Sequence, residues 1–434
     1  MEKNKSTVFD IDVENIPDDW GIVSLKAIDL GGKENIDPRA YPGDDFEYYS
    51  IPAYQEGGKP VIEKGENILS QKIIVQNDSV LFGKLNPRVE KVWHVQSETG
   101  YKKIASTEFI PIYPDQEKIF PRYLYYVEWS KFVMPKAKTL VTGSTPSRQR
   151  VDPTSFFKIK IPLPSRTEQV RIAFILSKLQ QAIAQQEQII MKTKELKRSL
   201  MHRLFTCGLR GDELKETVIG TVPISWNKKD LEQVADIVYG AQAAVAHALD
   251  SSIGTPIFTN INITNEGQID LTTLRYYKVP EKKRDRLMLK KGDILFNWRS
   301  GSKEHVGKTA LFELDGEYTF SSFILRFRAS KDIHNRFLVY YLYYLKSIGY
   351  FSQYRDQSSV NSVFNASASA KIPVFVPEMD EQKEIAASLN SIDRKIGVEK
   401  CRSNSINALF RTMLNNLMTG QVRVKDIDFG EINV

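Results

Sequence analysis

One segment of the chain ends like a phosphate-binding P-loop: residues 301–309, Gly-Ser-Lys-Glu-His-Val-Gly-Lys-Thr. A P-loop has four residues between its glycines, so that backbone amides surround the phosphates, and it opens a helix. Here five residues separate Gly301 from Gly307, and the following residues, 310–313 (Ala-Leu-Phe-Glu), have the pattern of a strand. We therefore expect no nucleotide site in this segment.

The same segment has a second interpretation, as the tip of a β-hairpin. The tip would carry three cations, a histidine and an aromatic residue: Arg299, Lys303, Lys308, His305 and Trp298. Cationic and polar side chains on a loop are what contacts to DNA phosphates and grooves require. A solvated turn explains the same residues, and the sequence leaves both interpretations open.

Two polar loops at corresponding places in the chain carry side chains suited to DNA. They are residues 144–150 (Ser-Thr-Pro-Ser-Arg-Gln-Arg) and 353–361 (Gln-Tyr-Arg-Asp-Gln-Ser-Ser-Val-Asn). Arg pairs well with guanine and Gln or Asn with adenine, while Ser or Thr suits phosphate. Polar loops are also common without such a role. The predicted DNA-binding residues are Lys84, Arg88, Ser144, Thr145, Arg148, Arg150, Trp298, Arg299, Lys303, Lys308, Arg355, Gln357 and Asn361.

Motifs for other chemistry are missing from the sequence. The five histidines are scattered, Cys207 and Cys401 have no metal-ligand spacing, and no carboxylate pair has a base beside it. The Asn-Pro-Pro-aromatic motif of adenine methyltransferases is missing too, and the nearest string is residues 86–88 (Asn-Pro-Arg). We expect no catalytic residue, no metal and no cofactor, and we predict that the chain cannot methylate by itself.

Length and composition favour a globular protein with a polyanionic partner. The chain has 434 residues, of which 41% are apolar, which suggests two to four domains. A net charge of +7 and a pI near 9.0 favour binding to a polyanion. The sequence has no apolar run of about 18 residues and no signal-peptide pattern, so we expect no membrane span. Two cysteines without a partner pattern fit a reducing compartment, and we predict a cytoplasmic location.

The elements that must position these loops are repeated. Residues 168–206 and 381–419 form long helical patterns that align without a gap at an offset of 213 residues. The repeat predicts a duplicated architecture. Identical residues of the first copy include Pro164, Glu168, Gln169, Ile172, Ala173, Leu176, Ile183, Leu196, Leu204 and Thr206, which align with Pro377, Glu381, Gln382, Ile385, Ala386, Leu389, Ile396, Leu409, Leu417 and Thr419 of the second.

Each long helix carries an apolar seam with alternating three- and four-residue spacing, which is typical of a coiled coil. Polar residues interrupt both seams near their middle: Gln186, Thr193 and Lys197 in the first, Glu399 and Ser403 in the second. A helix of about 37 residues is roughly 55 Å long, longer than most helices inside one globular domain. We predict that the helices are spacers, although two ordinary amphipathic helices of a duplicated domain would show the same pattern.

A globular segment precedes each helix, and both segments open with a tryptophan three residues after a proline, at Trp20 and Trp226. Runs of β-branched and aromatic residues at 72–75, 92–95 and 323–327 predict strands. Tyrosines at helical spacing predict helices at 122–132 and 335–348, with the tyrosines in the core. Proline-rich segments at 161–164 and 374–377 restrict the backbone to extended geometry, so we expect the globular parts to stop there.

The combination of proline segment, Glu-Gln pair and long helix resembles the repeats of specificity subunits of type I restriction-modification systems. The ending at 419–423 (Thr-Gly-Gln-Val-Arg) is similar to theirs as well. The resemblance spans essentially the whole chain, and the helical repeats together with the Pro-x-x-Trp openings make it specific. One departure is that Cys207-Gly208 stands where the second copy has Gly420-Gln421, at what we take to be a turn.

The resemblance implies an α+β fold with an internal pseudo-two-fold repeat. Two target recognition domains of mixed α/β structure would be separated by two long antiparallel coiled-coil helices. Antiparallel pairing would place Gln186 opposite Ser403, in a polar layer that can fix register. The predicted boundaries are recognition domain 1 at 1–160, a proline joint and spacer helix at 161–211, recognition domain 2 at 212–372, and a second joint, helix and tail at 373–434.

The resemblance also implies the partners. Each recognition domain would read one half of a split, asymmetric sequence in double-stranded DNA. Methyltransferase subunits that use S-adenosylmethionine would dock on the long helices, and a restriction subunit, which is a nuclease and translocase, would join them. The chain itself would be non-catalytic. The alternative is a duplicated scaffold that binds no DNA and only assembles partners through its coiled coil.

Overall fold

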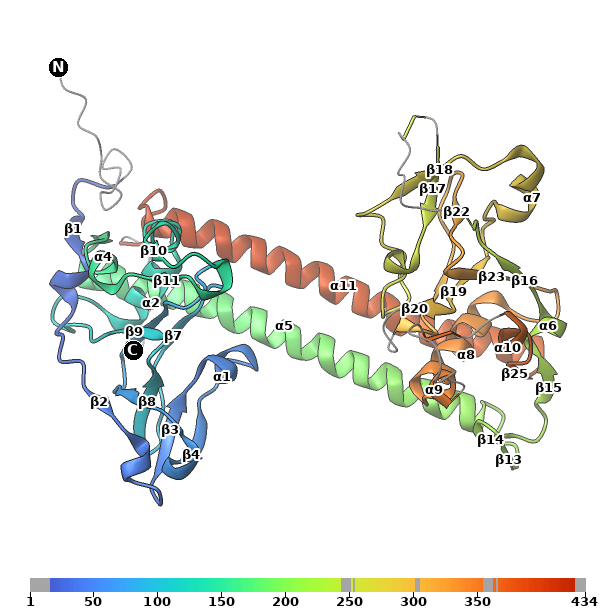
Figure 1. Ribbon diagram of the computed structural model, residues 1–434, viewed down its shortest axis with the longest axis horizontal. Coiled ribbons are helices and arrows are strands. Elements are labelled where there is room, and N and C mark those ends of the chain that lie inside the picture. The colour runs from blue at the N-terminus through green and yellow to red at the C-terminus, as the bar shows by residue number, and fades with distance from the viewer. Residues whose placement is uncertain are drawn as a thin grey trace. The chain divides into compact units, whose positions relative to one another are not determined.

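The computed structural model describes residues 16–242, 251–252, 254–300, 305–353, 362–363 and 366–425. The chain divides into two compact units, one made of residues 1–187 and 401–434 and the other of residues 188–400. Each unit combines one globular segment with a part of each long helix (Figure 1). No helix of the described residues is long and apolar enough to cross a membrane.

The globular part of the first unit contains two sheets. The five-stranded sheet has the order β2 (Asn35–Ile36), β5 (Lys72–Ile74), β8 (Lys102–Ser106), β3 (Asp45–Tyr49) and β4 (Val61–Lys64). The three-stranded sheet has the order β7 (Val92–His94), β6 (Val80–Gly83) and β9 (Phe109–Ile112). Neighbouring strands are antiparallel except β3 and β8. The strands predicted at 72–75 and 92–95 are confirmed as β5 and β7.

Four short helices complete this globular part: α1 (Ile51–Gln55), α2 (Pro121–Trp129), α3 (Met134–Thr139) and α4 (Pro153–Phe156). Helix α2 confirms the helix predicted at 122–132, although it ends three residues earlier. Its residues Tyr123 and Tyr126 are buried in one core with Val80 and Phe82 of β6, as expected for core tyrosines. Two short ladders close the fold: β1 (Gly21–Ser24) with β12 (Lys160–Leu163), and β10 (Val141–Thr142) with β11 (Arg150–Val151).

The second unit also has two sheets. The four-stranded sheet has the order β16 (Ala235–Tyr239), β23 (Ile324–Ala329), β19 (Ile294–Asn297) and β21 (Thr309–Leu311). The three-stranded sheet has the order β18 (Arg275–Tyr277), β17 (Thr255–Phe258) and β22 (Thr319–Phe320). The described residues of this unit also form three separate two-stranded ladders: β13 (Leu214–Thr217) with β14 (Gly220–Pro223), β15 (Asn227–Asp230) with β25 (Pro373–Val376), and β20 (Arg299–Ser300) with β24 (Ser362–Val363).

Helix α8 (Asn335–Ser347) is the main short helix of the second unit and confirms the helix predicted at 335–348. Its buried aromatic residues, among them Tyr341 and Tyr344, pack in one core with Phe296 of β19. The strand predicted at 323–327 is confirmed as β23, which begins one residue later and ends two residues later than predicted. The remaining short helices are α6 (Leu231–Val234), α7 (Arg284–Leu287), α9 (Tyr350–Gln353) and α10 (Ala366–Ala370).

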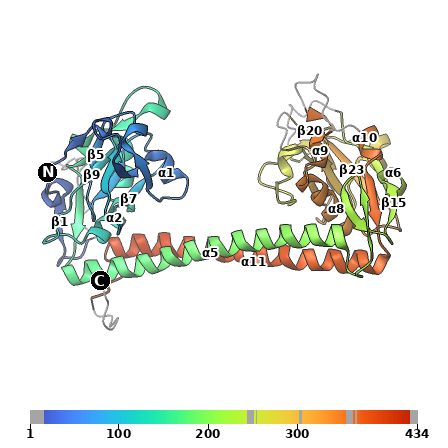
Figure 2. The same cartoon turned by 90° about the horizontal axis from the view of Figure 1, so that it is seen from below.

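The two long helices are confirmed as α5 (Arg166–Cys207) and α11 (Met379–Met418). In the first unit the beginning of α5 shares a core with the end of α11, through Ile172, Leu176 and Leu417. In the second unit the end of α5 shares a core with the beginning of α11, through Leu204 and Ile385. The helices therefore run antiparallel within each unit. Figure 2 shows that the strands and short helices of each unit, taken by itself, lie on one side of its helical segments.

Of the five polar residues that interrupt the seams, three are buried, and Lys197 and Glu399 are half-buried. Gln186 is 3% exposed, Ser403 is 8% exposed and Thr193 is 7% exposed. Both Gln186 and Ser403 belong to the first unit, in which the helices are antiparallel. That they share one polar layer stays a prediction.

The proline segments are strands of the globular parts, which corrects the expectation that the globular parts stop before them. Residues 160–163 pair with β1 as β12, and residues 373–376 pair with β15 as β25. Each ladder has only two strands, so a proline can direct its missing N–H away from the partner strand. Each globular part therefore continues to the first turn of its long helix.

A buried glutamine ties each long helix to its globular part in the same way. The Oε1 atom of Gln169 accepts a hydrogen bond from the backbone N–H of Phe120 at 2.7 Å, and its Nε2 donates to the carbonyls of Lys118 at 3.3 Å and Pro164 at 2.9 Å. Gln382 makes the equivalent bonds at the same three distances, to His334, Asp332 and Pro377. The Glu-Gln pair of the repeat is therefore a framework element.

Both long helices end at a glycine in the left-handed region, Gly208 with φ +62° and Gly420 with φ +69°. A side chain at either glycine would collide with the framework, because an added Cβ would lie 2.9 Å from Pro223 Cγ at Gly208 and 2.2 Å from Pro17 Cγ at Gly420. The departure at Cys207 is thus a shift of one residue: α5 is longer, and its terminal glycine follows one position later.

Candidate nucleic-acid interface

The first unit brings two of the predicted segments together. Strand β6 leads into residues 84–88, and Leu85 pairs with Arg150 in an isolated antiparallel bridge. The backbone N–H of Asn86 donates to the carbonyl of Gln149 at 2.8 Å, and that of Val151 donates to the carbonyl of Lys84 at 3.0 Å. Residues 84–88, which follow β6, and the loop before β11 therefore form one surface, although about 60 residues separate them in the sequence.

Most of the predicted side chains on this surface are exposed: Arg88, Ser144, Thr145 and Arg148. Lys84 is half-buried, and burial lowers the pKa of its ammonium group, while Glu108 nearby opposes that effect. The exposed set has the charge and hydroxyl groups that phosphate contacts require.

Arg150 has an intramolecular partner. Its guanidinium forms a two-pronged ion pair with the carboxylate of Glu108, with Nη2 to Oε1 at 2.8 Å and Nε to Oε2 at 3.0 Å. The hydrogen bonds to Glu108 raise the pKa of Arg150. Arg150 is therefore held in one place with its charge balanced, so its expected contribution to phosphate binding is smaller than that of Arg148.

The second unit contains the corresponding surface. Strands β19 and β21 form the predicted hairpin, with Phe296 opposite Thr309, and the P-loop interpretation is excluded because residues 309–311 are a strand. Directly after β19, β20 pairs with β24, so that Arg299 lies opposite Val363. This ladder takes the same place after the buried strand as the Leu85–Arg150 bridge does in the first unit.

Trp298 and Arg299 lie at an open pocket of about 480 Å³, whose other lining residues are Tyr239, Gln242, Ser322 and Phe323. The indole Nε1 of Trp298 donates to the carbonyl of Ser322 at 2.7 Å, and its ring lies edge-on to Tyr239 with centroids 5.3 Å apart. The sequence analysis did not select Tyr239, Gln242 or Phe323. Phe323 was assigned to a strand, and the Ser321-Ser322 turn before it was the only local sign of its exposure.

Lys308 does not share this exposure. It is 8% exposed, because it lies at the entry to β21, where its carbonyl accepts from the N–H of Asn297 at 2.8 Å. Burial lowers the pKa of its ammonium group. Lys308 is therefore not part of the surface in this conformation. The other predicted contacts, Lys303, Arg355, Gln357 and Asn361, lie outside the described residues.

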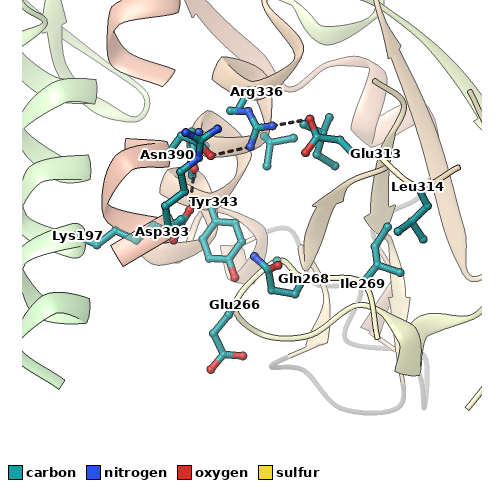
Figure 3. Close-up of a pocket in the computed structure, with 15 residues that line it drawn as sticks. Lys197, Glu266, Gln268, Ile269, Glu313, Leu314, Arg336, Tyr343, Asn390 and Asp393 are labelled. Atoms are coloured by element: carbon teal, nitrogen blue, oxygen red, sulfur yellow. Dashed lines mark hydrogen bonds and ion pairs between the residues drawn. The ribbon is translucent and has the colours of Figure 1, made fainter. Parts of the chain in front are cut away.

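A second pocket of the same unit, of about 400 Å³, lies between α8 and the long helices (Figure 3). Several of its polar groups are paired with one another. Arg336 bridges Glu313 and Asn390, with its Nη1 2.8 Å from Asn390 Oδ1. Asp393 accepts from the hydroxyl of Tyr340 at 2.7 Å and pairs with Lys197 at 2.7 Å. These bonds join the globular part to both long helices, so the pocket serves as a structural joint.

No group of three or more His, Cys, Asp or Glu side chains suited to a metal ion occurs among the residues that the structure describes. What the loop surfaces offer chemically is guanidinium, ammonium, hydroxyl and aromatic groups, which suit binding to a nucleic acid.

Comparisons with known proteins match this chain along most of its length. The family model described as the type I restriction modification DNA specificity domain matches residues 17–195 and 223–408. The MjaVIII specificity subunit, from a type I restriction enzyme of Methanocaldococcus jannaschii, is 27% identical over 434 residues, which cover 95% of each chain. The EcoKI specificity subunit of Escherichia coli is 22% identical over 342 residues, 74% of this chain and 70% of the relative.

Two solved structures share the fold. A chain from a structure on complex assembly and conformational transition of the type I R-M system has a TM-score of 0.60 at 19% identity, and the match covers 94% of this chain and 99% of that chain. The S subunit of a type I restriction-modification system from M. genitalium has a TM-score of 0.54 at 14% identity, over 92% and 96%. With both globular segments and both long helices included in the family match, the chain belongs to the type I restriction modification DNA specificity domain family.

Proposed function

We propose that the chain is the specificity subunit of a type I restriction-modification complex and that each unit reads one half of a split DNA site. One observation carries the proposal: both units place a short β-ladder and a polar loop at the end of the same buried strand, β6 or β19. The frameworks below these ladders are held by equivalent glutamines, Gln169 and Gln382.

The two surfaces differ in their residues, which supports an asymmetric site. The first presents Arg88, Arg148 and two hydroxyl residues, and the second presents Arg299 and an aromatic wall. Base recognition depends on the donor and acceptor pattern of the side chains. Two readers with different patterns are expected to select different half-sites.

The partners follow from the names of the relatives. The relatives are subunits of type I restriction enzymes, so methyltransferase and restriction subunits are the expected partners. We propose that the methyltransferase subunits dock on α5 and α11, where exposed residues outside the recognition surfaces are available. The specificity subunit contributes recognition, and the partner subunits contribute methylation and cleavage.

The test is a map of modified adenines after co-expression of the chain with the methyltransferase subunit of its own system. The proposal expects one split, non-palindromic motif. A continuous or perfectly palindromic motif would contradict it, as would a complex that methylates without sequence preference.

A duplicated scaffold that binds no DNA is the competing function, and salt dependence separates the two. A DNA reader loses affinity steeply as salt rises, because cations that neutralise phosphates release counterions. Binding of the purified chain, alone and with its methyltransferase, is measured on the mapped duplex between about 50 and 200 mM salt. Absence of specific binding at every salt concentration would favour the scaffold.

A further inference from the structure

Arg299 differs from the other cations of the two loop surfaces in how its side chain is held. Its guanidinium carbon lies 5.6 Å from the centroid of the Phe323 ring, and Phe323 is 39% exposed at the turn between β22 and β23. The Nε atom of Arg299 is buried and has no hydrogen-bond partner among the described residues. No carboxylate of the described residues pairs with Arg299, whereas Glu108 holds Arg150 at the corresponding ladder of the first unit.

Two neighbouring features hold Arg299 in place, the β20–β24 ladder and the preceding residue Trp298. The backbone of Arg299 lies in the β20–β24 ladder, opposite Val363. The preceding residue, Trp298, is fixed by its bond to the carbonyl of Ser322, which neighbours Phe323 in the chain. The indole N–H of Trp298 is thereby occupied, and the pocket still offers a ligand the guanidinium of Arg299 and the exposed amide of Gln242.

A guanidinium that is stacked on an aromatic ring is pre-organised for bidentate recognition. Arg presents a planar fork of N–H donors, and stacking on a ring reduces the conformational freedom lost on binding. In the major groove, the N7 and O6 acceptors of guanine match this fork, and this is the commonest specific contact of Arg with DNA. Arg can also bind a phosphate with two N–H donors, but Lys binds phosphate as a point charge, so a change to Lys weakens a guanine contact at one base and a phosphate contact without regard to sequence.

We infer that Arg299 reads a guanine in the half-site of the second unit and that Phe323 is the residue that positions it. The inference rests on the proposed function and adds a base and a side chain to it. Arg299 is the group in contact with DNA, and Phe323 acts through Arg299.

The experiment compares methylation motifs of complexes that carry one substitution each. Arg299→Lys keeps the positive charge but removes the planar fork. Phe323→Ala removes the stacking surface, and Phe323→Tyr restores a ring. Arg286→Lys is the matched control, since Arg286 is exposed on α7 of the same unit and away from the pocket. The readout is the modified-adenine map, together with affinity for duplexes in which each base of the half-site is changed in turn.

Arg299→Lys is expected to lower discrimination at one guanine by about ten- to a hundredfold and to leave the other positions unchanged. Phe323→Ala is expected to weaken the same position, and Phe323→Tyr and Arg286→Lys are expected to keep the wild-type motif. A uniform loss of affinity with an unchanged motif would identify a phosphate contact and overturn the inference. An unchanged motif at full affinity in Arg299→Lys would overturn it as well. A wild-type complex without a split motif would instead overturn the proposed function.

Discussion

Removal of Arg423 is expected to destabilise the first unit, because this side chain neutralises a buried carboxylate. The carboxylate belongs to Glu168, which is 2% exposed and accepts from Arg423 Nε at 2.8 Å and from Trp20 Nε1 at 3.0 Å. Arg423 also reaches Asp19 at 2.7 Å and lies over the Trp20 ring. One arginine near the end of the described chain thus ties α11, α5 and the Pro-x-x-Trp opening together.

The size of the effect follows from the charge that Arg423→Ala leaves behind. Breaking a fully buried ion pair costs about 3–5 kcal/mol, because the remaining charge has no partner. The Arg423 side chain is 24% exposed, so we expect a lower value of about 2–3 kcal/mol. For a unit of this size, that corresponds to a fall of roughly 5–10 °C in its melting temperature. The variant is expected to fold, because Arg171 still holds the carbonyl of Val424 at 3.1 Å.

The repeat provides a matched control at Arg210, which occupies the position of Arg423 in the other copy. Arg210 pairs with Glu384, and both side chains are about half exposed. The buried carboxylate of the second unit, Glu381, accepts instead from the backbone N–H of Leu209 at 2.7 Å, which no side-chain substitution removes. Arg210→Ala is therefore expected to have a much smaller effect, as is usual for exposed ion pairs.

The assay is thermal unfolding of the full chain, with hydrogen exchange to assign the loss to a unit. In Arg423→Ala, faster exchange is expected in peptides that cover 16–25, 165–175 and 417–425, with peptides from 188–400 unchanged. Equal destabilisation by Arg423→Ala and Arg210→Ala would refute the argument. Exchange that rises equally in both units would refute it too.

Four further predictions concern the framework and the DNA interface. Gln169→Leu leaves three backbone groups without their hydrogen-bond partner and should lower the free energy of unfolding of the first unit by about 2–3 kcal/mol. Gln382→Leu should destabilise the second unit by the same amount. Hydrogen exchange that rises equally in both units in either variant would contradict this. Burial opposes ionisation of Glu168, but the hydrogen bonds from Arg423 and Trp20 outweigh burial and lower the pKa of this carboxyl group. The ionised carboxylate therefore stabilises the fold above about pH 4.3, and this contribution is lost as the pH falls further. The stability difference between wild type and Arg423→Ala should shrink in acid denaturation curves below about pH 4. Replacing both Arg88 and Arg148 with Ala should lower the slope of log affinity against log salt by about two, with the motif retained, and an unchanged slope would show that neither contacts phosphate. Four residues added to each long helix, after Gln186 and after Glu399, lengthen each helix by roughly 6 Å. The gap between the two half-sites should then grow by one or two base pairs. An unchanged gap in an active variant would show that the helices do not set the gap.

The long helices and their attachment could be predicted from the sequence because both depend on local patterns that occur twice. Helical periodicity gave α5 and α11 to within two residues at each end. The Glu-Gln pair stood out because it is repeated, and the structure explains the repeat by the three bonds that Gln169 and Gln382 each make. The proline segments were misjudged as boundaries, because a proline excludes a helix but does not exclude a two-stranded ladder.

The candidate interface was predictable only in part, because it depends on contacts between distant segments. No local sequence pattern predicts that Leu85 pairs with Arg150. The charge of a lysine does not predict whether the hairpin buries it, as it buries Lys308. The ion-pair partner of Arg150, Glu108, lies in the turn between β8 and β9, and the aromatic partner of Arg299, Phe323, lies in the turn between β22 and β23. Residue type selected the loops, whose contact with DNA stays a prediction, and tertiary pairing decided which of their described side chains are available.

The two copies share their framework residues and differ in their loop residues, and each has a physical reason. A buried backbone group needs a hydrogen-bond partner wherever a loop meets the helix, so Gln169 and Gln382 carry the same bonds in both units. A surface loop has water as its default partner, so it has no such requirement, and its residues are free to differ. The ladders after β6 and β19 combine both: their backbone pairing belongs to the framework, while the side chain of Arg150 is exposed and that of Arg299 lines an open pocket. We therefore expect a change of side chain there to alter what the domain binds at little cost to folding, which is the property that a sequence-reading surface needs.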